Sequence, residues 1–208
     1  MELHTVIEAL RVKRSVFHSE ADFQFALAWE IQLAYPSAEI RLEYPPACDP
    51  NKRVDILVWL GGKAYPIELK YKSKKMTALI GDELFCLKNH GAQDLNAYDL
   101  IKDICRIESF AKQLEGFSCG YVLWLTNDPY YWREPTSDTV GYAQFSVHHG
   151  ATKQGLLCWN DSLSAGSIRG RETPLELAGS YPIAWNDYSD VGVSNGLFKY
   201  ALLEIHTP

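Results

Sequence analysis

Apolar residues dominate the segment 53–72, which reads as two strands joined by Gly61-Gly62. A glycine pair suits a two-residue hairpin turn, because the central residues of such turns need positive φ. A turn at these two glycines places Leu60 opposite Lys63. The pattern therefore predicts an antiparallel hairpin with a defined register.

This register places Asp55 opposite Glu68, and opposed residues point to the same face of a hairpin. Lys70 lies two residues beyond Glu68 and joins that face. Two carboxylates and an amine are thus expected on one patch of strands that are otherwise rich in Val, Ile, Leu, Trp and Tyr.

Other periodicities predict the elements around the hairpin. Helical spacing of apolar residues predicts three helices, at 4–14, from Ser19 as cap to Ala34, and at 94–114. Strands are expected at 40–44 and 121–126, whereas Thr77–Gly91 is left as a loop or a short helix.

The second half of the chain gives weaker signals. Short strands are expected near 142–148, 155–159 and 197–205, with long loops over 162–196, where Gly and Ser are frequent. We interpret 1–208 as one domain, with a core over about 15–126 and an irregular β-rich extension over about 127–208, because 208 residues suffice for one core.

Composition narrows the class of protein. Apolar residues make up 47% of the chain, which is typical of a globular fold, and no apolar run reaches membrane-spanning length, so no membrane partner is expected. Five widely spaced cysteines without a C-x-x-C motif predict free thiols and a cytoplasmic location. The net charge of −6 argues against a generally basic surface, but local charge decides contact with nucleic acid.

Charges on an apolar sheet are costly unless they pair or bind a cation. The oxygen ligands of Asp55 and Glu68 suit Mg²⁺ or Mn²⁺. The alternative is a solvated hairpin face whose charges pair only with one another. The apolar residues Leu57, Trp59 and Ala64 on the same side argue against it.

Asp55 followed by Glu68-Leu69-Lys70 resembles the motif of the PD-(D/E)xK nuclease superfamily, also called restriction-endonuclease-like. Val54 stands where the motif often has proline. The resemblance covers 53–72 closely, and the order of elements over about 15–126 agrees with it. It implies an α/β fold with a mixed central sheet flanked by helices, and a metal-dependent nuclease.

The resemblance also implies roles for residues. Asp55, Glu68 and the backbone carbonyl of Leu69 would hold Mg²⁺ or Mn²⁺, and Lys70 would orient or deprotonate the attacking water. The family often adds a glutamate from the first helix. For that role we favour Glu20 over Glu30, with Gln24 as a supporting residue.

Contacts with nucleic acid are expected from Lys72, Lys74 and Lys75, which follow the motif directly. Four charged residues of the predicted 94–114 helix are interpreted as a solvent face with internal ion pairs, namely Asp99, Lys102, Asp103 and Arg106. The alternative is that Lys102 or Arg106 contacts a phosphate near the site. The Tyr130-Tyr131-Trp132 cluster and His148-His149 are interpreted as packing, with base stacking as the alternative for the aromatics.

DNA is the usual substrate of the family, and RNA stays open, as do a homodimer and a partner protein. A second hypothesis is a catalytically inactive nuclease-fold binding or assembly protein, which the intact Glu68-Leu69-Lys70 motif disfavours. A different chemistry on the same carboxylates is the least favoured, because the sequence carries no nucleotide or cofactor loop.

Overall fold

The computed structural model describes residues 1–46, 50–137, 141–160, 163–164 and 166–206. The helices are α1 (Leu3–Lys13), α2 (Glu20–Ala34), α3 (Gln93–Gln113) and the short 3-10 helix η1 (Ala143–Phe145). The strands are β1 (Glu39–Tyr44), β2 (Val54–Leu60), β3 (Lys63–Lys72), β4 (Met76–Ile80), β5 (Glu83–Leu87), β6 (Gly120–Thr126), β7 (Thr152–Leu157), β8 (Leu175–Pro182), β9 (Trp185–Asp190) and β10 (Leu197–Ile205).

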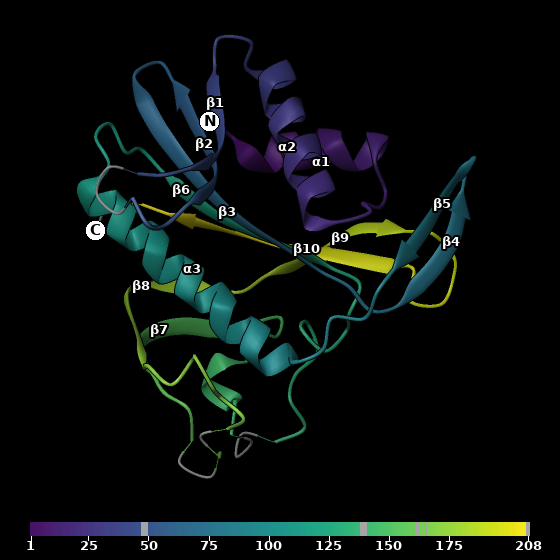
Figure 1. Ribbon diagram of the computed structural model, residues 1–208, viewed down its shortest axis with the longest axis vertical. Coiled ribbons are helices and arrows are strands. Elements are labelled where there is room, and N and C mark those ends of the chain that lie inside the picture. The colour runs from purple at the N-terminus through teal and green to yellow at the C-terminus, as the bar shows by residue number, and fades with distance from the viewer. Residues whose placement is uncertain (47–49, 138–140, 161–162, 165, 207–208) are drawn as a thin grey trace.

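Six strands form a central sheet in the order β1-β2-β3-β6-β10-β9. The β3–β6 pair is parallel and the other pairs are antiparallel, so the sheet is mixed. Helices α1 and α2 cover one face, and α3 crosses the other (Figure 1). This arrangement confirms the prediction of an α/β fold with a mixed central sheet flanked by helices.

Two hydrophobic cores lie on the two faces of the sheet. Alternate residues such as Ile56, Ile67 and Leu69 pack beneath α1 and α2. Leu57 and Trp124 pack with α3 in the second core. Strands with apolar residues on both faces are typical of the covered centre of a sheet.

The predicted hairpin is confirmed, and so is its register as far as Ile56, but the predicted pair of Asp55 and Glu68 lies beyond the last pair of the ladder. Leu60 pairs with Lys63, and the register continues to Ile56 opposite Ile67. Gly61 and Gly62 have φ of 59° and 75°, the positive values that this turn requires.

The helix predicted after Ser19 is also confirmed. The Ser19 side chain accepts a hydrogen bond from the Asp22 backbone N–H at 3.1 Å, as an N-cap residue does. Three large apolar side chains on the outer side of α2 are exposed, namely Phe25, Trp29 and Leu33.

The segment Thr77–Gly91 is mostly neither a loop nor a helix, because β4 and β5 form a two-stranded antiparallel sheet across 76–87. Ile80 pairs with Glu83, so Gly81 and Asp82 make a two-residue turn. Met76 and Ala78 are buried on one strand, and Phe85 and Leu87 on the other. This alternation places the apolar side of the hairpin against the first core, while the hairpin projects from the sheet (Figure 1).

Predictions for the second half were less accurate. The expected strand near 142–148 contains η1 instead, because the backbone N–H groups of Phe145 and Ser146 donate to carbonyl oxygens three residues earlier. The strand expected near 155–159 begins earlier, as β7. The segment 162–196, predicted as long loops, contains β8, which pairs with β7, and β9, which pairs with β10.

The last strands of the chain complete the central sheet. β10 lies antiparallel to β6 from Lys199 opposite Thr126 to Ile205 opposite Gly120. Cys86, Cys105, Cys119 and Cys158 are free thiols, and Cys48 lies outside the described residues. Among the described residues, no helix is both long and apolar enough to cross a membrane.

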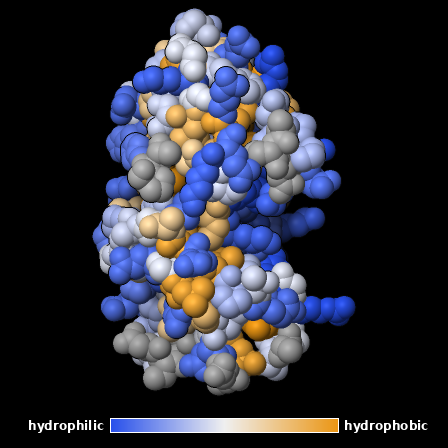
Figure 2. All heavy atoms as spheres, turned by 90° about the vertical axis from the view of Figure 1, so that its left-hand side faces the viewer, coloured by the Kyte–Doolittle hydropathy of each residue, from blue (hydrophilic) through white to orange (hydrophobic). Residues whose placement is uncertain are grey.

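Figure 2 shows the side of the molecule on which α3 ends. Hydrophobic side chains interrupt a mainly hydrophilic surface along the middle of this face.

Candidate functional site

The candidate site lies where the pairing between β2 and β3 ends, next to Ile56 and Ile67. The ladder between these strands has its last pair at Ile56 and Ile67, so it does not extend to Asp55 and Glu68. The Leu69 backbone N–H instead donates to Asp55 Oδ2 at 2.8 Å, and the Tyr71 N–H donates to Glu20 Oε2 at 2.8 Å. Two carboxylates thus take the place of a strand partner, since backbone N–H groups away from water need an acceptor.

Helix α2 supports the site through a second side chain. Gln24 is buried, and its Nε2 donates to the Asp55 backbone carbonyl at 2.7 Å and to Glu43 Oε1 at 2.8 Å. These bonds fix the end of β2 relative to α2. Glu20 lies one turn before Gln24 and reaches β3, whereas Glu30 pairs with Lys13 Nζ at 2.7 Å. The structure therefore brings Glu20, and not Glu30, to this cluster.

Glu68 is completely buried and is paired with helix α3. Arg106 Nη1 donates to both Glu68 carboxylate oxygens at 2.9 Å, and Arg106 Nη2 donates to Asp103 Oδ1 at 2.8 Å. The prediction that Asp103 and Arg106 belong to a solvent face is wrong. Asp103 is 2% exposed, because this side of α3 lies over the charged residues of β3. Lys102 is exposed, as predicted for a solvent face, whereas Asp99 is partly buried and pairs with Arg171 and not with a neighbour on the helix.

Lys70 completes the cluster. Its Nζ lies 3.0 Å from Asp103 Oδ2 and 3.3 Å from the Leu69 carbonyl oxygen. Burial disfavours the ammonium form, but the charges of Asp103, Asp55 and Glu20 outweigh burial and raise the Lys70 pKa above its usual value. Lys70 is therefore a charged hydrogen-bond donor in this arrangement.

The pKa values of the carboxylates are also raised, which for an acid disfavours the charged form. Burial raises the pKa of Glu68 well above its usual value, and the charges of Asp55 and Asp103 add to this effect. Burial also raises the pKa of Asp55, against the opposing influence of Lys70. Asp55 and Glu68 are thus close enough to repel each other, and a cation between them would relieve that repulsion.

By the chemistry of its donors this cluster suits a divalent cation such as Mg²⁺ or Mn²⁺, although the oxygens of Asp55, Glu68 and Glu20 do not all lie within 4.8 Å of one another in the described structure. Asp55, Glu68, Glu20 and the Leu69 carbonyl supply only oxygen ligands, which these ions prefer. Arg106 occupies both oxygens of Glu68, so a cation held by Glu68 would replace contacts that the guanidinium now makes.

The predicted nucleic-acid-binding lysines lie beyond this cluster. Lys72 Nζ is 4.0 Å from Glu20 Oε2, and Lys74 Nζ is 3.9 Å from Asp128 Oδ1. Lys75 is exposed. Lys72 is the last residue of β3, and Lys74 and Lys75 lie in the link between β3 and β4.

The aromatic cluster at 130–132 and the histidine pair at 148–149 lie in other parts of the structure. Tyr131 is 1% exposed and packs on Trp124, as predicted, and His149 Nδ1 accepts a hydrogen bond from the Trp185 backbone N–H. Tyr130 differs, since it is 38% exposed.

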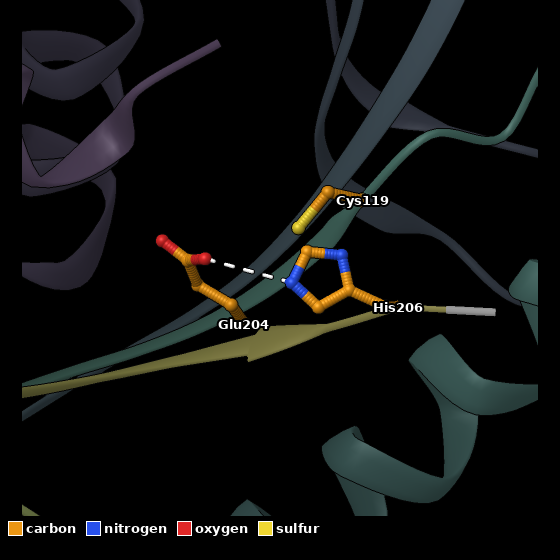
Figure 3. A group of neighbouring side chains, drawn as sticks. All are labelled: Cys119, Glu204 and His206. Atoms are coloured by element: carbon orange, nitrogen blue, oxygen red, sulfur yellow. Dashed lines mark ion pairs between the residues drawn. The ribbon is translucent and has the colours of Figure 1, made fainter. Parts of the chain in front are cut away.

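Cys119, Glu204 and His206 gather at the far end of β6 and β10 (Figure 3), with possible ligand atoms within 4.8 Å of one another. A thiol and an imidazole suit a softer ion than Mg²⁺. Burial raises the pKa of the Cys119 thiol, which favours its neutral form. This group is separate from the Asp55 and Glu68 cluster.

No family model, curated protein or solved structure matches this chain. Helical spacing places Asp103 and Arg106 on one side of a helix but does not assign them to the site. No pattern in the sequence indicates Glu43. The signal that could have assigned Asp103 and Arg106 was the predicted shared face of the hairpin, where two carboxylates, Asp55 and Glu68, meet only one amine, Lys70, so that a further cation from another element is required.

Proposed function

We propose that the protein is a divalent-metal-dependent nuclease of the PD-(D/E)xK type, which hydrolyses phosphodiester bonds, with DNA as the favoured substrate. The observation that carries this proposal is the convergence of Asp55, Glu68 and Lys70 with Glu20 where β2 leaves β3. Oxygen ligands and an ammonium group at one strand edge are the groups that this chemistry needs.

Asp55 and Glu68 would hold the cation, with the Leu69 carbonyl and Glu20 as further ligands. A bound divalent cation lowers the pKa of a water ligand and offsets negative charge on a phosphate oxygen. The backbone contacts of Asp55 and Glu20 hold their carboxylates in place before any ligand arrives. Such preorganisation reduces the rearrangement needed during the reaction.

Lys70 would act as a donor. Because its pKa is raised, it keeps its proton near neutral pH and can donate to a phosphate oxygen or to the attacking water. Asp103 fixes the ammonium at 3.0 Å. This assignment selects the orienting role for Lys70 over removal of a proton from water.

Lys72, Lys74 and Lys75 would contact the phosphate backbone, which is the sequence-independent part of nucleic-acid binding. The choice between DNA and RNA is an outcome of the cleavage test below. A cytoplasmic location, a homodimer and a partner protein stay predictions of the sequence.

A second candidate function is a nuclease-fold protein that binds or assembles without catalysis. The Arg106 contacts favour it, because the buried charges of Glu68 and Asp103 already have partners within the protein. A buried ion network of this kind can exist without a metal, since Arg106 and Lys70 compensate the charges of Glu68 and Asp103.

Cleavage assays separate the two candidates. Plasmid, linear duplex, single-stranded DNA and RNA are incubated with Mg²⁺ or Mn²⁺ and the intact protein, Asp55→Asn or Lys70→Ala. Metal-dependent cutting that both variants lose supports the nuclease. A folded protein that neither cuts nor binds Mn²⁺ in calorimetry would support the non-catalytic candidate.

A further inference from the structure

A pocket of about 360 Å³ opens beyond the ends of the parallel strands β3 and β6. The last residues in register are Lys72 and Thr126. Past them, the Lys74 backbone N–H donates to Asn127 Oδ1 at 2.7 Å, so the two strand exits stay together. Ligands of open α/β sheets bind outside the carboxyl ends of the strands, which is where this pocket lies.

A buried carboxylate forms the polar part of the pocket. Asp128 Oδ1 accepts from the Tyr130 backbone N–H at 3.1 Å, and Oδ2 accepts from Gln93 Nε2 at 3.2 Å. Lys74 Nζ lies 3.9 Å from Oδ1. An ionised carboxylate has about four acceptor positions, so Asp128 can accept further hydrogen bonds from a ligand.

Aromatic rings line another part of the pocket. The rings of Tyr130 and Tyr142 are 5.8 Å apart at 46°, and both residues line the cavity. Tyr131 supports Tyr130 from the interior with an edge contact at 5.7 Å. An exposed ring held by a buried one offers a fixed surface on which a flat ligand can stack.

The charges of the pocket are balanced and do not select a phosphate as its ligand. The carboxylates of Asp128 and Glu134 line it together with the cations of Lys74 and Arg133. A neutral ring with an amino group matches the pocket better, since it can stack on tyrosine and donate to Asp128. Cytosine, adenine and guanine carry such an amino group, whereas thymine does not.

We propose that this pocket binds an unpaired nucleobase that carries an amino group, in the strand whose phosphate lies at the Asp55 and Glu68 cluster. The proposal rests on the proposed nuclease function. Lys74 lies four residues beyond Lys70 on the chain that leaves β3, which corresponds to about 13 Å at the rise of a strand. The pocket and the cluster could therefore be reached by one nucleic-acid strand.

The test measures binding in the Asp55→Asn background, with EDTA, so that no cleavage occurs. The probes are single-stranded oligodeoxycytidine and oligodeoxythymidine of about twelve nucleotides, and a duplex of the same length. We expect oligodeoxycytidine to bind more tightly than oligodeoxythymidine. The added Tyr130→Leu change should weaken single-strand binding about tenfold and leave duplex binding within about twofold.

Asp128→Asn tests the carboxylate separately, and it should remove the preference for cytosine over thymine. Trp29→Leu is the matched control, because Trp29 is also an exposed aromatic residue, at 67%, but lies on α2 away from the pocket. Unchanged single-strand affinity in Tyr130→Leu, or an unchanged preference in folded Asp128→Asn, would overturn the pocket proposal.

The measurements distinguish a wrong pocket proposal from a wrong nuclease proposal. DNA binding and cleavage that are independent of Tyr130 and Asp128 would remove only the pocket. A chain that neither binds these probes nor cuts any nucleic acid would remove both proposals.

Discussion

Arg106 Nη1 lies 2.9 Å from both carboxylate oxygens of Glu68, a residue 38 positions earlier in the chain. Glu68 is fully buried, so this guanidinium is the main compensation for its charge among the described contacts. The same carboxylate is a proposed metal ligand. Arg106 and a divalent cation are therefore expected to compete for Glu68.

Arg106→Met should destabilise the metal-free protein by about 3–5 kcal/mol, since it leaves a buried carboxylate without its partner. Added Mn²⁺ should restore more stability to this variant than it adds to the intact protein. Urea unfolding with EDTA and with Mn²⁺ measures both effects.

Lys102→Met is the control for Arg106→Met, because Lys102 is an exposed cation on the same helix. It should change stability by less than about 0.5 kcal/mol. An equal response to Mn²⁺ in the Arg106 variant and the intact protein would contradict the competition.

The two glutamates of α2 give a matched pair for the metal site. Glu20→Gln should weaken Mn²⁺ binding, because Glu20 reaches β3, whereas Glu30→Gln should leave it unchanged, because Glu30 pairs with Lys13. Asp55→Asn should reduce Mn²⁺ binding more than Glu20→Gln does. Titration calorimetry compares the variants, and weaker binding in Glu30→Gln alone would reverse the assignment.

Asp103→Asn should lower the pKa of Lys70, since it removes the nearest of the charges that raise this pKa. If the Lys70 ammonium is the active form, cleavage falls as the pH rises through this pKa. In the pH–rate profile, the rate of the intact protein should therefore hold at least up to the usual lysine pKa of 10.5, whereas the rate of the variant should begin to fall at a lower pH.

Asp99→Asn serves as the control for this shift, because Asp99 pairs with Arg171, and the charges that raise the Lys70 pKa are those of Asp103, Asp55 and Glu20. Its alkaline limb should match that of the intact protein. An Asp103→Asn profile that falls in rate but keeps its shape would argue against a charged Lys70 in the reaction.

Lys153 offers a pH prediction outside the site. It is 5% exposed, and its Nζ donates to the Gln144 carbonyl oxygen at 2.9 Å. Burial lowers the Lys153 pKa from its usual 10.5 to about 8. Between these two pH values the unfolded chain binds more protons than the folded protein, so this group adds stability as the pH rises.

Below about pH 8, Lys153 is charged in both states and its burial destabilises the fold in full. Lys153→Met should therefore raise the melting temperature at about pH 7, and the gain should shrink at about pH 10. Lys63→Met, at an exposed turn position, should show no such pH dependence. A gain that is equal at both pH values would refute the prediction.

The sequence predicted the β2–β3 hairpin because its turn and register are local. Gly61-Gly62 defines the turn, and the period of two then places each side chain. The role of the charged residues of α3 was harder to predict from the sequence. Helical spacing groups Asp103 with Arg106 but does not show what lies opposite them. That depends on Glu68 and Lys70, which tertiary packing brings beneath the helix.

The strands of the second half were not predicted correctly, for a related reason. β7 pairs with β8 after an intervening segment, and its register shifts between Gln154 and Gly155. Such pairing is decided by partners that are distant in sequence, and short strands carry too few residues for their period to be distinctive.

The hydrogen bonds from the Leu69 and Tyr71 amides should make these two backbone positions report on cation binding by Asp55 and Glu20. Asp55 and Glu20 accept these amide protons in the described structure. When the same carboxylates turn toward a cation, the hydrogens of both amides should exchange with solvent faster, or their NMR chemical shifts should change. Whether the site is loaded could then be followed at two named backbone positions, without any substrate being cut.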